Sequence, residues 1–386
     1  MGKRVVRIAM NGVTGRMGYT HHLVRSLLAM RERGGLELPD GTTVWPEPVL
    51  VGRNPAKLAA IAEAHDLKDW TTSLDEVLAD ETVEIYFDAQ TTSEHFPALS
   101  SAIDAGKAVY VEKPSASTLA EAVALAVAAD TRGVPNGVVM DKLFLPGLRK
   151  LRRLIEGGAL GRIIALRGEF GYWVFEGDWQ PSQRPSWNYR AEDGGGIVAD
   201  MFCHWRYVLD EVVAPVHSVY AQVATHLPTR WDEHGQPYSA TADDAAFAVF
   251  ELDGGVVAQI NSSWATRVFR DELVEFHVDG TEGSAVAGLQ RCRYQPRAVT
   301  PRATWDPDAP PGYDFRAGWQ EVPGNGATGN AFARQWEAFL SHVVAGTPFP
   351  WDLWAGARGV QLASLGVQSA REGRKLEVPA LEAPGS

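Results

Sequence analysis

Short apolar runs alternate with longer amphipathic stretches over residues 1–144. The apolar runs predict buried strands, and the stretches between them predict helices. The expected strands are 5–10, 49–51, 83–89, 108–111 and 137–140, and the expected helices are 17–33, 55–65, 73–79, a segment ending at 105, and 118–131. Between the first helix and the second strand, residues 34–48 are expected to form a loop with a turn at Pro39-Asp40-Gly41. Strands that alternate with helices predict a parallel sheet, whose ligand lies beyond the carboxyl ends of the strands.

The pattern changes near residue 144, after which strand-like stretches follow one another. They predict strands at 163–175, 217–226, 245–252, 256–264, 274–278 and 284–287, with hairpin turns at Asp253-Gly254-Gly255 and Asp279-Gly280. Helices are expected at 146–157, 197–209, 330–345 and 353–372, and a loose tail at 381–386. We therefore expect two domains, 1–144 and 145–386, the second built on a large, mainly antiparallel open sheet. Such a sheet needs its other face covered, so we expect a homodimer or homotetramer formed through it.

A glycine-rich turn follows the first expected strand. Its residues 11–18 place Gly12, Gly15 and Gly18 in a GxxGxxG spacing just before a helix. A strand, a glycine turn and a helix in this order suit a dinucleotide pyrophosphate, because the glycines allow close approach and the helix N-terminus faces the anion. The residues expected to bind the cofactor here are Gly12, Thr14, Gly15, Arg16 and Met17. A tight turn without any ligand would use the same glycines.

The second expected strand ends at Gly52-Arg53-Asn54, where an NAD-selective fold usually carries an acidic residue for the ribose 2′-hydroxyl. Arg53 could instead pair with a 2′-phosphate, and Arg16 could face the same group. We therefore expect NADP or NAD as the cofactor, with NADP favoured, and include Arg53 and Asn54 in its site. The alternative is that Arg53 is a solvated residue at a strand end.

Two further expected strands are followed by polar or charged residues that could contact a ligand. Gln90 and Thr91 follow one strand, and Lys113 follows the strand 108–111, so both sets lie at the edge where a ligand is expected. At this position the Lys113 ammonium could hydrogen-bond a reacting oxygen and stabilise its negative charge. A lysine at a strand end is also commonly just a solvated terminus.

In the second half, Gly194-Gly195-Gly196 precedes the expected helix 197–209, which carries Asp200 and His204. A spacing of four residues places the two side chains on one helical face. A carboxylate beside an imidazole can orient a general base that takes an alcohol proton. An Asp/His pair at this spacing is also common as a surface or capping pair.

Composition narrows the possible partners. The chain has 48 acidic and 36 basic residues, a net charge of -12, which disfavours nucleic-acid binding. Its two cysteines, Cys203 and Cys292, form neither a disulfide framework nor a metal cluster, and no metal is expected. The N-terminus enters a strand within a few residues, and no apolar run approaches the roughly 18 residues of a membrane span. We therefore expect a cytoplasmic protein without a membrane partner.

Several motifs together resemble one family. Glu112-Lys113-Pro114, the N-terminal glycine loop and the glycine triplet followed by Asp200 and His204 are similar to the glucose-fructose oxidoreductase / inositol dehydrogenase (Gfo/Idh/MocA) family. The segments 105–107, 155–161 and 369–374 extend the resemblance over nearly the whole chain.

The resemblance implies an α/β fold, with an N-terminal Rossmann domain that binds NAD(P) and a C-terminal α/β domain that binds substrate and forms the oligomer. It implies oxidation of a secondary hydroxyl on a sugar, glycoside or cyclitol, or the reverse reduction. Lys113 takes the place of the family lysine, His204 that of the acid/base, and Asp200 that of the carboxylate that binds substrate or supports the histidine. His95 and Glu112 are expected beside the cofactor.

The chain also departs from the family pattern. Gln90-Thr91 stands where many relatives have Thr-Pro, and Lys142 replaces an arginine that often contacts substrate. The segment just before the glycine triplet supplies possible sugar contacts, although packing roles are equally compatible: Trp187, Tyr189 and Arg190. Of the 13 tryptophans only Trp45 and Trp70 precede residue 144, so the second domain could stack on sugar rings or simply bury these side chains in its core.

The expected mechanism places His204 and Lys113 on one hydroxyl group. His204 takes its proton, Lys113 polarises its oxygen, and hydride passes from its carbon to the nicotinamide. Two alternatives remain: a redox-neutral enzyme that cleaves a glycosidic substituent with retained NAD, and a non-catalytic sensor of dinucleotide or sugar.

Overall fold

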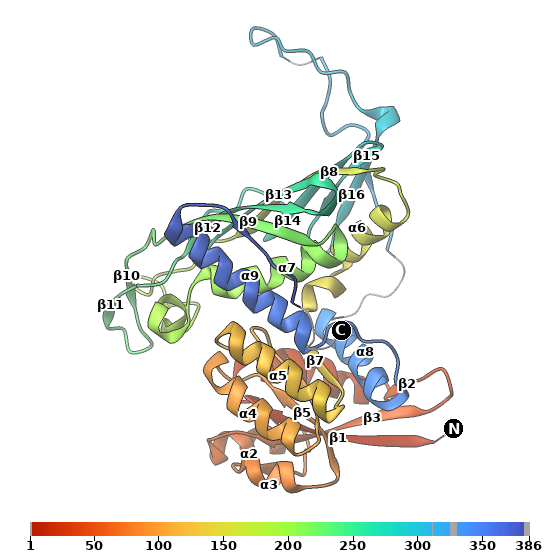
Figure 1. Cartoon of the computed structure of the whole chain (residues 1–386), viewed down its shortest axis with the longest axis vertical. Coiled ribbons are helices and arrows are strands. Elements are labelled where there is room, and N and C mark those ends of the chain that lie inside the picture. Colours follow the sequence, from red (N-terminus) through yellow and green to blue (C-terminus); the bar gives the residue numbers. More distant parts are fainter. Residues whose placement is uncertain (1, 311, 325–329, 382–386) are drawn as a thin grey trace. The chain divides into compact units, whose positions relative to one another are not determined.

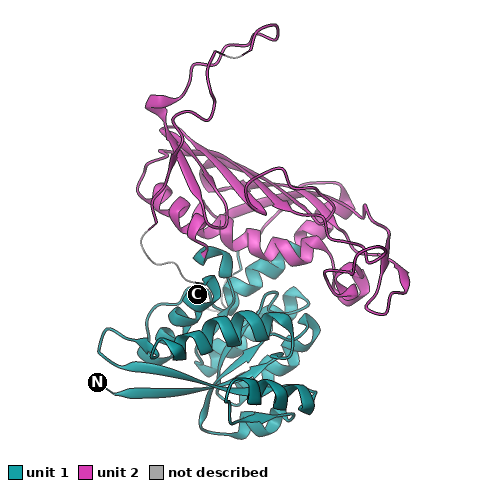
Figure 2. Cartoon of the chain, turned by 180° about the vertical axis from the view of Figure 1, so that it is seen from behind, with its two compact units in different colours: residues 1–144, 329–364, 380–386 teal, residues 145–328, 365–379 magenta. Residues whose placement is uncertain are grey.

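A computed structural model describes residues 2–310, 312–324 and 330–381. The chain forms two compact units (Figure 2): residues 1–144, 329–364 and 380–386, and residues 145–328 and 365–379. Helix α8 (Ala331–Ala345) and most of α9 (Leu353–Glu372), which the sequence placed in the domain 145–386, thus belong to the first unit. Most of the expected tail at 381–386 lies outside the described residues.

The first unit has a twisted sheet of order β2-β3-β1-β5-β6-β7, with β4 also beside β3 and only β2 antiparallel (Figure 1). Its strands are β1 Lys3–Asn11, β2 Leu36–Glu37, β3 Thr43–Val51, β4 Trp70–Thr71, β5 Val83–Asp88, β6 Ala108–Val111 and β7 Asn136–Val138. Its helices are η1 Met17–Leu28, α1 Ala29–Glu32, α2 Pro55–Ala64, α3 Leu74–Ala79, α4 Thr92–Asp104, α5 Leu119–Arg132 and η2 Asp141–Phe144, besides α8 and α9. This arrangement confirms the predicted Rossmann domain.

One local prediction needs correction, and one predicted helix has an unusual winding. The expected loop at 34–48 is wrong in its second half, because β3 begins at Thr43 and runs through Pro46 and Pro48. Leu50 donates its N–H to Asp69 O (3.0 Å), on the side of β3 away from β1. Since alternate residues face the same side, both prolines turn their missing donors there, between the short stretches paired with β2 and β4. The expected helix 17–33 is confirmed, although η1 is wound as a π-helix.

Helix α8 joins the first unit through its apolar face. Trp336, Phe339 and Leu340 are fully buried in the cluster that includes Ile8 of β1. Phe339 also stacks on Tyr110, with ring centroids 4.5 Å apart. Burial of these side chains explains why a segment nearly two hundred residues beyond β7 completes the first core.

The second unit has nine described strands in the order β17-β16-β15-β14-β8-β13-β12-β9-β18, antiparallel except between β8 and β13. Their bounds are β8 Ile163–Gly171, β9 Val216–Ala224, β12 Ala245–Leu252, β13 Val256–Ser263, β14 Val274–Gly280, β15 Gly283–Ala287, β16 Cys292–Pro296, β17 Gln320–Glu321 and β18 Leu376–Glu377. The hairpin of β10 (Thr229–Trp231) and β11 (Pro237–Ser239) stands apart. The large, mainly antiparallel sheet and the hairpin turn at Asp253-Gly254-Gly255 are confirmed. The second hairpin turns at Thr281-Glu282 instead of Asp279-Gly280, because both of the latter residues still belong to β14.

The two faces of this sheet differ. Helices α6 (Pro146–Glu156) and α7 (Ile197–Val212) cover one face (Figure 1). On the other face Tyr220 of β9 lies directly opposite Val249 of β12, and the two side chains are 39% and 38% exposed. Phe247 and Val257 are likewise exposed on neighbouring positions. The strands therefore present an apolar strip to solvent within this chain.

Candidate active site

The glycine loop after β1 is shaped by close approaches that exclude side chains. Gly12 has a φ of +80°, and a Cβ atom there would lie 2.4 Å from the carbonyl carbon of Ala89. A Cβ atom at Gly18 would lie 2.6 Å from Gly12 O, so the helix packs directly on the turn. Both positions therefore require glycine for geometric reasons.

The turn leads into a helix end that is open to an anion. Arg16 is the N-cap residue of η1 and makes no side-chain capping hydrogen bond, and Thr14, Gly15 and Arg16 are exposed, with Met17 half-buried. The first N–H groups of a helix lack carbonyl partners within the helix, and its dipole favours negative charge. The backbone cradle and the uncapped helix together fit the pyrophosphate of a dinucleotide.

The end of β3 lies beside this loop. A Cβ atom at Gly52 would approach the Thr14 methyl carbon to 3.7 Å, so the following residue, Arg53, emerges next to the glycine turn with its side chain exposed. Asn54 instead caps α2, its side-chain oxygen accepting the N–H of Lys57 at 3.1 Å. Arg53 is thus available to a ligand, whereas Asn54 has a helix-capping role.

His95 lies in a buried polar pair at the ends of β5 and β6. Its Nδ1 is 2.8 Å from Pro114 O, and because a carbonyl only accepts, Nδ1 carries the proton. Its Nε2 lies 3.8 Å from Asp88 Oδ1, and both side chains are buried. Burial raises the pKa of Asp88, against the opposing charge of His95. The hydrogen bond to Pro114 O fixes His95 to the backbone that follows Lys113.

Gln90 is held at the same edge by the ends of β1 and β5. Its N–H donates to Asp88 Oδ1 (2.9 Å), and its side-chain oxygen accepts from Asn11 Nδ2 (2.9 Å). Asn11 also donates to the Tyr86 hydroxyl at 2.9 Å. Thr91 follows as the exposed N-cap residue of α4. These bonds tie two strand ends together where the cofactor is expected.

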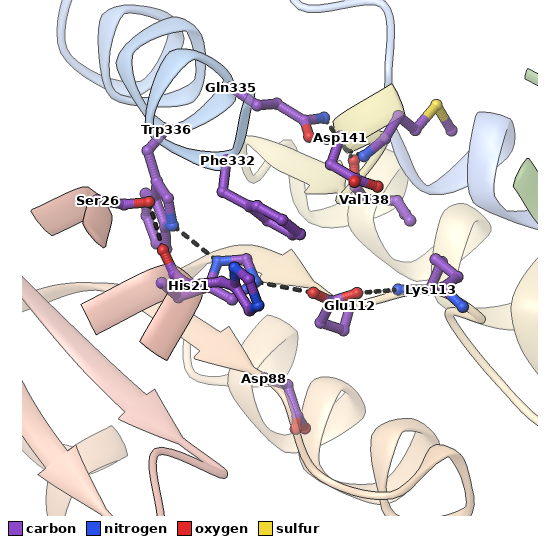
Figure 3. A network of polar contacts seen from close by, with 12 residues as sticks. His21, Ser26, Asp88, Glu112, Lys113, Val138, Asp141, Phe332, Gln335 and Trp336 are labelled. Atoms are coloured by element: carbon purple, nitrogen blue, oxygen red, sulfur yellow. Dashed lines mark hydrogen bonds and ion pairs between the residues drawn. The ribbon is translucent and has the colours of Figure 1, made fainter. Parts of the chain in front are cut away.

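Lys113 follows a buried carboxylate (Figure 3). Glu112 Oε1 lies 2.8 Å from His22 Nε2, and Glu112 Oε2 accepts the backbone N–H of Lys113 at 3.2 Å. Burial alone would raise the pKa of Glu112, but the hydrogen bond from His22 and the nearby charges of Lys113 and Lys142 lower it overall. Lys142 itself pairs with Asp141 at 2.9 Å within η2.

The glycine triplet of the second unit seats helix α7. A Cβ atom at Gly195 would lie 2.4 Å from Trp187 O, and Gly196 has a φ of +121°. The carboxylate of Asp243 accepts the Val198 N–H (2.8 Å) and caps the helix. Helix α7 thereby carries Asp200 in its first turn and His204 one turn later.

Asp200 and His204 have further partners that the sequence did not predict. Arg184 Nη1 lies 3.1 Å from Asp200 Oδ2, and the guanidinium stacks on Trp264 at 4.4 Å. His204 is buried, and its Nδ1 lies 2.6 Å from the Tyr207 hydroxyl. Spacing i,i+3 on a helix was an available signal for Tyr207. Arg184 comes from an irregular segment, and its position depends on contacts that no local pattern encodes.

The three possible sugar contacts before the triplet have different environments. Trp187 is 38% exposed, whereas Tyr189 is fully buried with the Arg230 guanidinium 3.8 Å above its ring. Burial raises the pKa of Tyr189 to about 12. Arg190 lies over the Tyr238 ring at 4.6 Å. Tyr189 therefore has a packing role in this structure, and Trp187 remains open to a ligand.

Neither a candidate metal cluster nor a membrane-spanning helix occurs among the described residues. Among residues 2–310, 312–324 and 330–381, no group of three or more His, Cys, Asp or Glu side chains could hold a metal ion. In the same part of the chain, no helix has the length and apolarity needed to cross a bilayer. A Rossmann sheet with a glycine cradle and an open helix end defines a dinucleotide-binding protein.

Comparison with family models identifies the kind of enzyme. Residues 6–139 match the model of the oxidoreductase family with an NAD-binding Rossmann fold, and residues 148–286 match the GFO/IDH/MocA C-terminal domain. The chain belongs to the GFO/IDH/MocA oxidoreductase family and is an enzyme.

Individual relatives agree with this assignment. The chain is 58% identical to D-xylose dehydrogenase of Paenarthrobacter nicotinovorans over 379 residues, 97% of this chain and 98% of the relative. It is 30% identical to 1,5-anhydro-D-fructose reductase of Ensifer adhaerens over 59% of this chain and 64% of that protein. The structure of levoglucosan dehydrogenase in complex with NADH and L-sorbose shares the fold, with a TM-score of 0.81 and 21% identity, covering 98% of this chain and 100% of that one.

Proposed function

We propose that this enzyme oxidises a secondary hydroxyl of a sugar with NAD(P), or reduces the corresponding keto form, and that an aldopentose such as D-xylose is the first substrate to test. The observation that carries the proposal is the 58% identity to D-xylose dehydrogenase over 97% of this chain. Residues 1–144 would bind the dinucleotide, and the chain from residue 145 would supply the substrate site.

The proposed chemistry assigns one task to each residue. The bound nicotinamide supplies the hydride acceptor. Lys113 donates a hydrogen bond to the reacting oxygen and stabilises its developing negative charge. His204 receives the hydroxyl proton at Nε2, while Tyr207 holds Nδ1 at 2.6 Å and orients the ring.

Asp200 and Arg184 would bind the other sugar hydroxyls. Their ion pair is only partly buried, with side chains 23% and 22% exposed, so a ligand could reach both side chains. A carboxylate accepts and a guanidinium donates, which together suit a vicinal diol. Trp187 and Lys142 are further candidate contacts at exposed and half-buried positions.

A substrate panel tests the proposed function. The purified enzyme would be mixed with aldopentoses, aldohexoses, cyclitols and glycosides, each with NAD and with NADP, while absorbance of the reduced cofactor is followed. Reduction with one sugar class would support the proposal. Release of an aglycone without added cofactor would instead favour redox-neutral cleavage, and binding without any turnover would favour a sensor.

The cofactor preference is proposed to rest on Arg53. Arg53→Ala is expected to raise the KM for NADP by about ten- to a hundredfold, because a charge-assisted hydrogen bond contributes about 1.5–3 kcal/mol. The KM for NAD should change little. The measurement is kcat/KM for both cofactors at saturating sugar, with exposed Lys68→Ala as the matched control. Equal effects of Arg53→Ala on NADP and NAD would contradict this role.

The exposed strip of the large sheet is proposed to form the oligomer. The double variant Phe247→Glu/Val249→Glu is expected to convert a homodimer or homotetramer into smaller species, since it buries charge in an apolar contact. Multi-angle light scattering measures the mass. Val299→Glu, at another exposed apolar position, is the control and should leave the mass unchanged. A monomeric wild-type mass would remove the proposal.

A further inference from the structure

Three buried side chains of the first unit form a chain of hydrogen bonds that ends at Lys113 (Figure 3). The Trp336 indole Nε1 donates to His22 Nδ1 at 2.9 Å, and His22 Nε2 lies 2.8 Å from Glu112 Oε1. Glu112 Oε2 accepts the backbone N–H of Lys113 at 3.2 Å. Trp336 and His22 are 0% exposed and Glu112 is 8% exposed. We name this series of hydrogen bonds the Trp336–His22–Glu112 relay.

Every bond in the relay has a fixed direction. An indole N–H can only donate, so His22 Nδ1 accepts and carries no proton. His22 therefore carries its proton on Nε2 and donates it to Glu112. Because the N–H of Lys113 is also a donor, both oxygens of Glu112 act as acceptors. An ionised carboxylate is the side chain that satisfies both positions.

The relay ends where the sheet hydrogen bonds of β6 end. Glu112 N still donates to Asp88 O of the neighbouring strand at 2.9 Å. The next N–H along the chain, that of Lys113, goes to the Glu112 carboxylate instead. The backbone of Lys113 is thus fixed by a side chain, and that side chain is fixed by His22.

Helix α8 anchors this arrangement through two consecutive residues. Gln335 Nε2 donates to Val138 O (3.0 Å), and Gln335 Oε1 accepts the N–H of Met140 (2.7 Å). Trp336, the next residue, starts the relay. Helix α8 therefore holds the backbone at the end of β7 directly through Gln335. It also holds the backbone at the end of β6, through Trp336, His22 and Glu112.

Burying a carboxylate is costly, and well-packed apolar side chains of similar volume commonly stabilise a core as well or better. A charge kept in the core at the residue before Lys113 therefore needs a reason other than stability. We propose that the Trp336–His22–Glu112 relay is a positioning device, which holds the Lys113 backbone so that its ammonium meets the reacting oxygen; this inference rests on the proposed role of Lys113.

The first test is Glu112→Gln. Glutamine offers one acceptor and one donor, so in either orientation its NH2 group faces another N–H, either that of His22 or that of Lys113. Displacement of a catalytic group by about 1 Å can cost about a hundredfold in rate. We expect kcat to fall about ten- to a hundredfold, with the KM values for sugar and cofactor changed by about threefold or less.

A pair of variants at His22 separates the two bonds of its ring. His22→Asn keeps an acceptor for Trp336 but loses the donor to Glu112, and its kcat should fall as for Glu112→Gln. His22→Gln keeps the donor to Glu112 but leaves the Trp336 N–H without its acceptor. Combining His22→Gln with Trp336→Phe removes that orphaned donor, and this double variant should restore kcat to within about threefold of wild type.

Phe349→Leu is the control for lost stability, because Phe349 lies in the same apolar core without belonging to the relay. It should lower the Tm and leave kcat unchanged. If Glu112→Gln and His22→Asn behaved like Phe349→Leu, the positioning role would be overturned. Full turnover in a Lys113 variant would instead refute the proposed role of Lys113, on which this inference rests. Loss of turnover at Lys113 combined with wild-type kcat in the relay variants would refute the relay alone.

Discussion

Replacing Lys113 by methionine is expected to lower kcat by about a hundredfold or more, the range usual for a positioned acid/base group. Methionine keeps most of the length of the side chain and removes its charge. Lys113 follows β6 at the carboxyl edge of the parallel sheet, where ligands of such sheets bind. Without the ammonium, the negative charge on the reacting oxygen loses its nearest proposed donor.

The experiment must separate chemistry from cofactor binding. Steady-state kcat would be measured at saturating sugar and cofactor, and the Kd of the cofactor by quenching of protein fluorescence. Lys142→Met is the matched comparison, because Lys142 is another half-buried lysine whose ammonium pairs with Asp141 at 2.9 Å. It should raise the KM for sugar and affect kcat far less. Near-wild-type kcat in Lys113→Met would remove the residue from the mechanism.

The part of the site that the sequence predicted well lies at the ends of buried parallel strands. Buried strands are apolar runs, so their ends are visible in the sequence, and parallel pairing brings those ends to one edge. Gly12, Gln90 and Lys113 follow β1, β5 and β6 in this way. The glycine loop was equally visible, because close backbone approach at Gly12 leaves no space for a side chain.

Residues whose roles depend on distant segments escaped prediction. Arg184 meets Asp200 across 16 positions of the chain, and Trp336 meets His22 across 314. Neither contact leaves a periodic signal, because each depends on how separate elements pack. The same reason explains why α8 joined the first unit: its apolar face indicates burial without indicating which core receives it.

The prediction of a loop at 34–48 failed for a different reason. Pro46 and Pro48 lie inside β3, although each proline removes a backbone donor from the strand. The strand tolerates both residues because they face a side of β3 that lies between the short partners β2 and β4. Only the sheet topology, which is a property of the whole unit, shows that those donors are not needed.

Replacing His204 by alanine should lower kcat by about a hundredfold or more, for the loss of the proposed proton acceptor. The histidine is 4% exposed and its Nδ1 lies 2.6 Å from the Tyr207 hydroxyl, and we assign the proton exchange to Nε2. Tyr207→Phe should have a smaller effect of about three- to tenfold, because it removes one neutral hydrogen bond and leaves the base in place.

Imidazole added to the solution distinguishes a lost base from a damaged fold. If His204 accepts the proton, imidazole should enter the space left by His204→Ala and raise kcat in proportion to its concentration, while Tyr207→Phe should not respond. Asp200→Asn is the second comparison: its carboxylate pairs with Arg184, so the main expected change is a higher KM for sugar. Wild-type turnover in His204→Ala with bound cofactor would show that another group accepts the hydroxyl proton. A deficit that imidazole cannot relieve, accompanied by a lowered Tm, would indicate that His204 serves the packing of α7 instead.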